Sequence, residues 1–435
     1  MITRIKGTQD FLDLSLYNWI LQKAKKHLID YNFHEISTPL IEPLELFKRS
    51  LGLETDVVSK EMYRVLSDVA LAQAADSASV DSDKMCLRPE LTASIMRAFI
   101  NAGIQDTPWK VFSVGPAFRH ERPQKGRYRQ FHQMSMEIIG SESILQDALF
   151  IAMLDTFFTN VLKIEGYALL INYLGTREDR AEYQRVLKKF LEKHIAELCD
   201  LCKHRMNTNI MRVFDCKQEG CQKLFLSAPT IIDTMAQESA FEWQQLKDIL
   251  EELSITYSVK PTLVRGLDYY NKTVFEFVSI PAHPERVEGA GLGAQNTFCG
   301  GGRYDTLATQ IGAKNDYPSI GAAVGLERLQ LLLEAQKTLI GHDTQPSLAV
   351  VIPLAAEHQP LGLQIVQMLH AEHICADIIL DKSSIKSMFK AADKMGAKWA
   401  ILIGADEQAS GMATIKNMTT GLEVKVPQRD IIQHI

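Results

Sequence analysis

The sequence predicts an α+β protein with several domains, and three features support this fold class. Residues 109–139 alternate apolar and polar side chains in two runs, WKVFSV and FHQMSMEII, as two antiparallel strands joined by a long loop do. Residues 175–259 become polar and helical in pattern, which indicates an inserted module. After Pro346 the runs AVVIPL, ADIIL and WAILIG alternate with helical patterns, as in a compact α/β domain.

Composition narrows the class of protein. The 435 residues are enough for about two to four domains. Lysine and arginine number 47 against 53 acidic residues, which argues against a cationic protein that coats DNA. The seven cysteines are thinly spread and odd in number, which indicates reduced thiols and a cytoplasmic location. No run reaches the ~18 apolar residues of a membrane span, so we expect a soluble protein with no membrane partner.

The N-terminal elements follow from short patterns. Leu16–Tyr31 has the apolar period of a helix and leads into an extended segment that ends at Thr38-Pro39. Residues 68–83 are small and acidic, so we expect a solvated loop without chemistry between strands at Tyr63–Leu66 and Met85–Leu87.

The later elements surround two glycine-containing segments. Thr273–Val278 has the composition of a strand. The glycines at Gly300–Gly302 predict a turn before a helix-like run, and Gly321–Leu333 predicts a strand that continues into a helix.

The connector between the two strands of residues 109–139 carries the densest chemical signal. It holds one acid, Glu121, and five basic residues, which give residues 119–129 a local net charge of +4: Arg119, Arg122, Lys125, Arg127 and Arg129. Planar guanidinium groups bind phosphate with two hydrogen bonds, so the pattern favours an anion site. The alternative is a solvated hairpin with surface ion pairs. Gln133 and Glu137 on one face of the following strand favour the site.

Three other segments carry weaker signals. In VRGLDYY, Arg265 and two tyrosines flank a glycine, but an arginine beside tyrosines is equally common in a core. The glycine run of CGGGRYD has the composition of a phosphate-binding nest. In GAAVGLERL, small residues precede Arg328 at the start of a helix. The sequence contains no Walker motif and no G-x-G-x-x-G that opens a βαβ unit, so ATP would not be bound by either of these phosphate-binding loops.

Taken together and in order, these segments resemble the class II aminoacyl-tRNA synthetases and, within them, the histidyl-tRNA synthetase family. FRHERPQKGRYRQFHQ is similar to motif 2 of the class, GLERL to motif 3 and the Leu16–Glu42 segment to motif 1. RGLDYY and GGRYD resemble the two histidine-specific signatures, and IKGTQDF resembles the opening of the family. The resemblance covers nearly the whole chain.

The resemblance implies a class II core, an antiparallel sheet flanked by helices. The core would comprise residues 1–174 and 260–335, with a helical insertion at 175–259 and an α/β anticodon-binding domain at 346–435. It also implies that L-histidine and ATP give histidyl-adenylate and pyrophosphate, and that the histidyl group then passes to tRNA(His). Mg²⁺ would bridge the phosphates of ATP, and the motif 1 helix would join two chains in a homodimer.

The resemblance also implies roles for single residues. Arg119 and Arg265 would stabilise the charge that builds on the α-phosphate, and they would be the catalytic residues. Glu90, Thr92 and Gln133 would hold the α-ammonium group of histidine, and Glu137 and Tyr270 would bind the two imidazole nitrogens. The whole histidine site would comprise Glu90, Leu91, Thr92, Arg119, Gln133, Glu137, Arg265, Tyr269, Tyr270 and Tyr304.

The implied ATP site overlaps the histidine site at Arg119. Glu121 would contact the adenine amino group and Phe131 would stack on the adenine ring. Arg127 and Arg328 would bind the outer phosphates. Glu90 has an alternative role, because an ion pair with Arg88 would give it a purely structural function.

Two features depart from the family pattern. Leu91 stands where bacterial members often have glycine, which affects the expected shape of that loop. Residues 280–295 are longer than the usual link, and we expect a surface loop there.

The insertion contains four cysteines with a spacing close to that of a zinc ribbon. They follow the pattern C-x2-C-x13-C-x4-C: Cys199, Cys202, Cys216 and Cys221. The alternative is a set of reduced thiols, and catalysis in the family needs no such metal, so the sequence assigns no metal ligand.

A catalytically silent paralogue is the competing interpretation of the whole chain. A regulatory subunit of histidine biosynthesis resembles these synthetases, but we expect such a protein to lose RGLDYY or the C-terminal domain. This chain retains Arg265, Tyr270 and Arg328 together with a C-terminal region of 90 residues, 346–435. These features favour the enzyme.

Overall fold

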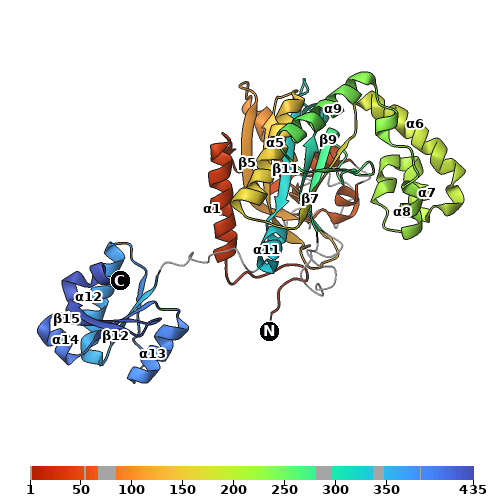
Figure 1. Cartoon of the computed structure of the whole chain (residues 1–435). Coiled ribbons are helices and arrows are strands. Elements are labelled where there is room, and N and C mark those ends of the chain that lie inside the picture. The colour runs from red at the N-terminus through yellow and green to blue at the C-terminus, as the bar shows by residue number, and fades with distance from the viewer. Residues whose placement is uncertain (1, 53–54, 67–84, 281–295, 337–346, 383) are drawn as a thin grey trace. The chain divides into compact units, whose positions relative to one another are not determined.

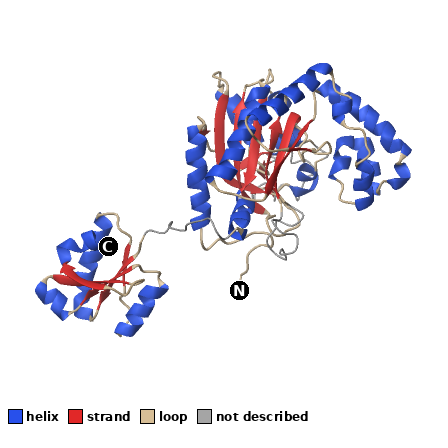
Figure 2. Ribbon diagram, viewed as in Figure 1, coloured by secondary structure: helices blue, strands red, loops and turns tan. Residues whose placement is uncertain are grey.

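The structure is a computed structural model, and it describes residues 2–52, 55–66, 85–280, 296–336, 347–382 and 384–435. The chain forms two compact units, Met1–Leu339 and Ile340–Ile435, which Figures 1 and 2 draw. The predicted loop at 68–83 lies outside the described residues. So does nearly all of the predicted loop at 280–295.

The first unit is built on an eight-stranded sheet with the order β1-β5-β6-β11-β10-β9-β7-β8. Neighbouring strands are antiparallel, except that the edge strands β1 and β8 pair in parallel with β5 and β7. The strands, in sheet order, are β1 His34–Glu35, β5 Trp109–Phe118, β6 Gln130–Ile139, β11 Ser319–Gly325, β10 Thr297–Arg303, β9 Asn271–Ser279, β7 Tyr167–Tyr173 and β8 Ser258–Val259. The predicted antiparallel pair, β5 and β6, is confirmed.

Helices cover the apolar face of this sheet. The helix predicted at Leu16–Tyr31 is α1, Ser15–Asp30, and the predicted strand and helix at 321–333 are β11 and α11, Leu326–Ala335. α5, Ile144–Thr156, continues into the π-helix η2, Phe157–Val161, and its buried face lies in the core. Figure 1 shows α1, α5 and α11 beside the sheet, so the predicted antiparallel sheet flanked by helices is confirmed.

The α5–η2 segment is also the one helix of the described residues that passes a length and hydropathy test for a membrane span. Its window, Ile144–Val161, has a mean hydropathy of 1.3 and is half buried within the protein. The segment includes Asp147, whose carboxylate pairs with Arg303 inside the core. These contacts are those of a core helix in a globular unit.

A second layer carries short elements over the polar face of the sheet. A three-stranded sheet has the order β2-β4-β3 and comprises Ile41–Pro43, Met85–Leu87 and Arg64–Val65. The helices of this layer are α2 Leu44–Leu51, η1 Val57–Glu61, α4 Thr92–Ala102 and α10 Leu307–Gln310. They share one buried apolar cluster with Tyr269, Tyr270 and Tyr304, so this layer and the sheet enclose the tyrosines between them.

The insertion is helical, as its composition predicted. It comprises α6 Arg177–Lys193, η3 Ile195–Glu197, α7 Asp200–Thr208, η4 Ile210–Asp215, α8 Glu219–Phe225, η5 Ile231–Asp233 and α9 Gln237–Glu252. Thr176 and Asp179 form a capping box at the start of α6, which satisfies backbone donors that the first turn leaves free.

The second unit is an α/β domain on a five-stranded sheet with the order β13-β12-β14-β15-β16. Its elements are β12 Ala349–Pro353, η6 Ala356–His358, α12 Gln359–Ala371, β13 Ala376–Ile378, α13 Ile385–Lys394, β14 Trp399–Ile403, α14 Ala405–Ser410, β15 Met412–Asn417, β16 Glu423–Pro427 and η7 Gln428–His434. The predicted alternation through WAILIG is confirmed as three parallel strands, and the two antiparallel strands that follow it were not predicted.

Candidate active site

One face of the large sheet carries small and polar side chains where the other face is apolar. Because side chains alternate along a strand, β6 presents Gln133, Ser135 and Glu137 on this face and its methionines on the other. The strand register places small residues beside them, Gly321, Ala323 and Gly325 of β11 and Ser113 and Gly115 of β5. Groups from other segments can therefore approach the sheet closely at this point.

Glu137 lies on this face with its side chain completely buried. Its carboxylate accepts hydrogen bonds from the hydroxyl of Thr92, at 2.7 Å, and from that of Tyr304. Burial raises the pKa of Glu137 to about 8, against the opposing effect of these two hydrogen bonds. A carboxyl group with this pKa exchanges its proton near neutral pH, so it can either donate to or accept from a ligand.

A second buried acid, Glu90, lies at the start of α4. Its carboxylate accepts hydrogen bonds from the backbone N–H groups of Thr92, at 2.6 Å, and Ala93, at 2.8 Å. Burial raises the pKa of Glu90, although both hydrogen bonds act in the opposite direction. Leu91, between Glu90 and Thr92 in the chain, is completely buried and is the N-cap residue of α4.

Arg88 does not hydrogen-bond to this acid. Its guanidinium group donates to the backbone oxygens of Thr38 and Pro116, each at 2.9 Å. An added Cβ at Gly115 would overlap the guanidinium group. Arg88 thus ties the second layer to β5, and Glu90 remains available to a ligand.

Several polar atoms near these acids lack partners. Among the residues that the structure describes, four buried atoms of this region have no hydrogen-bond partner: Ser113 Oγ, Gln133 Oε1, Ser135 Oγ and Arg265 Nε. A buried polar atom without a partner costs roughly 1–3 kcal/mol, so such atoms are rare in folded proteins. Their grouping here indicates a site for a polar ligand.

Three tyrosines enclose the acids. The ring centroid of Tyr269 lies 4.5 Å from that of Tyr270 and 5.6 Å from that of Tyr304. All three are buried, and burial raises the pKa of Tyr269 and Tyr304 well above the usual value. Their hydroxyl groups therefore stay neutral and can act as hydrogen-bond donors at physiological pH.

Arg265 enters the same face from the segment before β9. It forms an ion pair with Glu276 of β9, and its guanidinium group lies 5.5 Å from the centroid of the Tyr270 ring. Burial acts to lower the pKa of Arg265, but Glu276 together with Tyr270 and Tyr269 outweighs it, so the pKa is raised. A permanent positive charge is therefore held in a largely buried position.

The predicted glycine-rich turn at Gly300–Gly302 was wrong, because these residues lie within strand β10. An added Cβ at Gly300 would come within 2.5 Å of the Arg265 guanidinium group, and one at Gly301 would overlap the backbone of Gly321. The glycines therefore make room for an arginine and for a neighbouring strand, and they do not form a phosphate nest.

A cluster of three guanidinium groups lies on the motif 2 side of the site. Arg127 pairs with Glu121 and lies 3.9 Å from Glu61, and Arg328 donates to the backbone oxygen of Gly126. Burial, together with the charges of Arg119 and Arg127, lowers the pKa of Arg328 to about 10. Cations that repel one another in a partly buried place indicate a binding site for a polyanion.

Arg119 joins this cluster to the acids described above. Its Nε donates to the backbone oxygen of Pro89 at 2.9 Å, and its guanidinium group lies 5.4 Å from the centroid of the Phe131 ring. Arg122 and Lys125 of the same connector are exposed. The basic connector therefore divides into side chains that face the site and side chains in solvent.

A cavity of about 360 Å³ opens next to Arg265, on the side of the insertion. Four arginines are among its lining residues, Arg177, Arg180, Arg212 and Arg265. Arg180 donates to the backbone oxygen of Tyr270 at 2.7 Å. The cavity is thus a basic space whose lining includes Tyr270 and does not include Glu137.

Sequence reasoning missed two acids that position groups around the site. Glu276 pairs with Arg265 and accepts a hydrogen bond from Thr297 at 3.0 Å, and it is the lone acid in the apolar run TVFEFV. That isolated charge was the available signal. Glu327, in the GLERL segment, accepts from the backbone N–H of His132 at 2.8 Å. Glu276 thus positions Arg265 on the ligand face, and Glu327 joins β6 to the start of α11.

Comparisons with known proteins agree with this geometry. A family model described as histidyl-tRNA synthetase matches residues 15–329, and one described as anticodon binding domain matches residues 348–435. The histidine–tRNA ligase of Fervidobacterium nodosum is 36% identical over 439 residues, which cover 100% of this chain and 98% of that protein. The chain belongs to the histidyl-tRNA synthetase family.

Solved structures extend the comparison. The apo histidyl-tRNA synthetase of S. aureus superimposes with a TM-score of 0.78 at 30% identity, over 100% of this chain and 99% of that one. A protein from Bacillus halodurans C described as an ATP phosphoribosyltransferase regulatory subunit/histidyl-tRNA synthetase gives a TM-score of 0.60 at 17% identity, over 90% and 96% of the two chains. The latter shares the fold with this member of the histidyl-tRNA synthetase family.

Proposed function

We propose that this chain is a histidine–tRNA ligase. It activates L-histidine with ATP to histidyl-adenylate and pyrophosphate, and it then transfers the histidyl group to the 3′ end of tRNA(His). One observation supports the proposal beyond family membership. Glu137, a buried carboxyl group that accepts from two hydroxyl groups, lies in the same site as the guanidinium cluster. The first group suits an imidazole and the second a triphosphate.

Histidine would be held at both of its polar ends. Glu90, Thr92 and Gln133 would take the α-ammonium group, and the unpartnered Gln133 Oε1 is an acceptor ready for it. Glu137 and Tyr270 would bind the imidazole nitrogens, while Leu91, Tyr269 and Tyr304 line the pocket. An amino acid that lacks an imidazole would leave these buried groups unpaired, which is the basis of strong discrimination.

ATP would lie on the guanidinium cluster. Glu121 would contact the adenine amino group, Phe131 would stack on the ring, and Arg127 and Arg328 would bind the outer phosphates. Mg²⁺ would enter with the nucleotide and would offset part of the negative charge of its phosphates.

Arg119 and Arg265 would stabilise the reaction itself. As the histidine carboxylate attacks the α-phosphate, negative charge builds at the phosphorus and its oxygens. Arg119 is fixed by Pro89 and Arg265 by Glu276, so both cations are in place before the reaction starts. Such preorganised charges lower the barrier because no reorganisation is needed in the transition state.

tRNA(His) would contact both units. Transfer requires its terminal ribose to reach the adenylate, and the arginine-lined cavity next to Arg265 and Tyr270 offers a basic approach to that point. The C-terminal unit matches an anticodon-binding domain and would hold the other end of the tRNA.

A homodimer would cover apolar side chains that one chain leaves in water. Near the motif 1 segment, Ile2 and Leu12 are almost completely exposed, and Ile29 of α1 and Ile41 of β2 are about half exposed or more. Exposed apolar groups of this kind mark protein interfaces. We place the enzyme in the cytoplasm, where its seven free thiols would stay reduced.

Pyrophosphate exchange into ATP, measured with each of the twenty amino acids, tests the proposal. Exchange with histidine alone is the expected result. A folded protein that binds ATP but exchanges with no amino acid would overturn the enzyme and favour a regulatory paralogue.

A further inference from the structure

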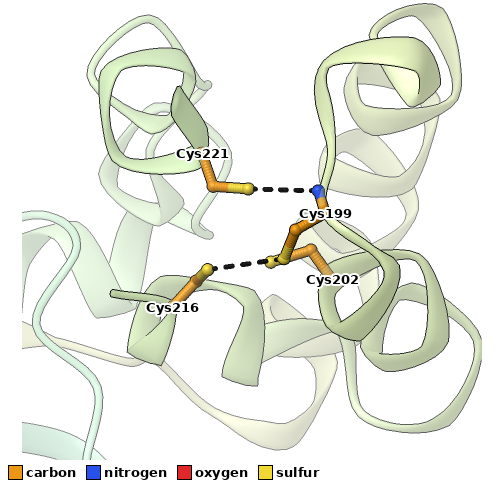
Figure 3. A group of neighbouring side chains, drawn as sticks. All are labelled: Cys199, Cys202, Cys216 and Cys221. Carbon is orange, nitrogen blue, oxygen red and sulfur yellow. Dashed lines mark hydrogen bonds between the residues drawn. The ribbon is translucent and has the colours of Figure 1, made fainter. Parts of the chain in front are cut away.

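The four cysteines of the insertion converge from separate short segments. Cys199 precedes α7 and Cys202 lies in its first turn, Cys216 follows η4, and Cys221 lies in α8. Figure 3 shows their side chains directed toward a common point between these segments. All seven cysteines of the chain are free thiols, so no disulfide explains the convergence.

The spacing of the four sulfur atoms fits a single tetrahedral metal ion. All four Sγ atoms lie within 4.8 Å of one another, and those of Cys199 and Cys216 are 3.7 Å apart. A zinc ion with four thiolates at about 2.3 Å has sulfur atoms roughly 3.8 Å apart along each tetrahedral edge. A four-iron cluster occupies more space and would hold its thiolates farther apart.

The surroundings of the sulfur atoms suit thiolates. Cys202, Cys216 and Cys221 are buried, while Cys199 is partly exposed and leaves a path to solvent. The backbone N–H of Cys199 donates to Cys221 Sγ at 3.3 Å, and that of Gln218 donates to Cys216 Sγ at 3.4 Å. Such donors spread the net negative charge of a four-thiolate zinc site and orient its ligands.

The elements that carry the cysteines are short. The two helices, α7 and α8, have 9 and 7 residues, too short to be stable alone, and 3-10 turns connect them. They share an apolar cluster of thirteen buried residues with α6, η4 and η5, and three of the four cysteines are members of it. A metal centre is a common replacement for a larger core in a module of this size.

We propose that Cys199, Cys202, Cys216 and Cys221 bind one zinc ion, which fixes the fold of the insertion. Binding would release the thiol protons and join α7, η4 and α8 at one point. The centre is structural, because four protein ligands leave no open position for a substrate.

The site also bears on the active site through η4, which lies between Cys202 and Cys216. Arg212 of η4 donates to the backbone oxygen of Gly266 at 2.8 Å and pairs with Asp268 at 3.1 Å. Gly266 and Asp268 belong to the RGLDYY segment that carries Arg265. The zinc centre therefore positions Arg212, and Arg212 supports the segment that presents Arg265.

Metal analysis of the full-length protein, purified without chelator, is the first test. We expect about one zinc per chain in the wild-type protein and in Cys375→Ser, which removes a thiol outside the cluster. Cys216→Ser and Cys221→Ser should each hold less than about a tenth of that zinc. Less than about a tenth of an equivalent in wild-type protein, with no uptake of added zinc, would overturn the proposal. Iron in place of zinc would overturn the choice of metal.

Two further measurements avoid dependence on the variants' folding. Cobalt(II) added to metal-free wild-type protein should give the intense visible bands of tetrahedral thiolate coordination, and weak octahedral bands would contradict four cysteine ligands. Removing the zinc should make the 199–221 region more sensitive to protease and should lower the rate of histidine-dependent pyrophosphate exchange. An unchanged exchange rate in protein shown to be metal-free would overturn the link through Arg212 to Arg265.

Discussion

Gly321 of β11 pairs with Glu137 of β6 across the centre of the sheet, and a Cβ added at Gly321 would overlap Glu137 Oε2. The buried carboxyl group thus occupies the space that a side chain on the neighbouring strand would fill. Its hydrogen bonds to Thr92 and Tyr304 depend on that space. A glycine on the neighbouring strand therefore determines where the proposed imidazole-binding group lies.

Gly321→Ala adds one methyl group and should nevertheless weaken histidine binding strongly. We expect the carboxyl group to shift, the free energy of unfolding to fall by about 1–3 kcal/mol, and KM for histidine in pyrophosphate exchange to rise about 10- to 100-fold. Gly325→Ala on the same strand is the matched control, because its Cβ would meet Arg328 at an ordinary 3.5 Å. Equal loss of stability in the two variants would contradict this explanation.

The raised pKa of Glu137 predicts a dependence of stability on pH. An acid whose pKa rises from its usual value to about 8 on folding binds its proton more tightly in the folded state. Its contribution to stability is therefore present below pH about 4.5 and is lost as pH rises toward 8.

Replacing Glu137 by glutamine should remove this dependence. The free energy of unfolding of each protein would be measured in urea, without histidine, from pH 5 to pH 9. Over this range the wild type should lose roughly 2–4 kcal/mol more than Glu137→Gln loses. Parallel curves for the two proteins would show that Glu137 ionises as freely in the folded chain as in the unfolded one.

Arg265 should act mainly in the transition state. Arg265→Ala is expected to lower the rate of adenylate formation about 10²- to 10³-fold and to weaken histidine binding less than about 10-fold. Because this change also leaves Glu276 without its cation, the double variant Arg265→Gln/Glu276→Gln separates the two effects. Equal losses in rate and in binding, measured by single-turnover kinetics and calorimetry, would argue for a role in substrate binding alone.

The guanidinium cluster should determine the affinity for ATP. Burial and the charges of Arg119 and Arg127 lower the pKa of Arg328, and Arg328→Gln removes this cation. KM for ATP should rise at least about 10-fold, and KM for histidine should stay nearly unchanged. Arg122→Gln is the matched control because Arg122 is an exposed arginine of the same basic connector. If both variants behave alike, the connector acts through its overall charge and not through this cluster.

Local patterns were sufficient to predict much of the fold. The alternation in WKVFSV and FHQMSMEII predicted β5 and β6, because a strand with one apolar face repeats every two residues. The same pattern placed Gln133 and Glu137 on one face, where the structure has them. The roles of these residues came from the family resemblance, and the structure adds the contacts that make the roles chemically reasonable.

The features that the sequence could not predict are those that depend on which strands pair. Gly300–Gly302 has the composition of a turn, and only the register with β9 and β11 shows why a strand has no side chains there. Glu276 is likewise 11 residues from Arg265, and their ion pair requires the chain to return through β9. Contacts of this kind depend on the tertiary fold, so local pattern reasoning does not reach them.

Arg303 and Asp147 form a buried ion pair in the core of the first unit. The two residues are 1% and 0% exposed, and Arg303 donates to both carboxylate oxygens, at 2.9 and 2.7 Å. It also donates to the backbone oxygens of Ser141 and Ser143, just before α5. The pair therefore joins β10 to the start of that helix.

Breaking the pair on one side should cost far more than removing it. Arg303→Met would leave Asp147 charged and unpaired in the core, and we expect a loss of about 3–5 kcal/mol in the free energy of unfolding. Arg303→Met/Asp147→Leu removes both charges, and it should recover at least about half of that loss. Urea unfolding of the three proteins measures the difference. A double variant no more stable than Arg303→Met would mean that the contribution of Arg303 comes from its bonds to Ser141, Ser143 and Asp305, and not from its pair with Asp147.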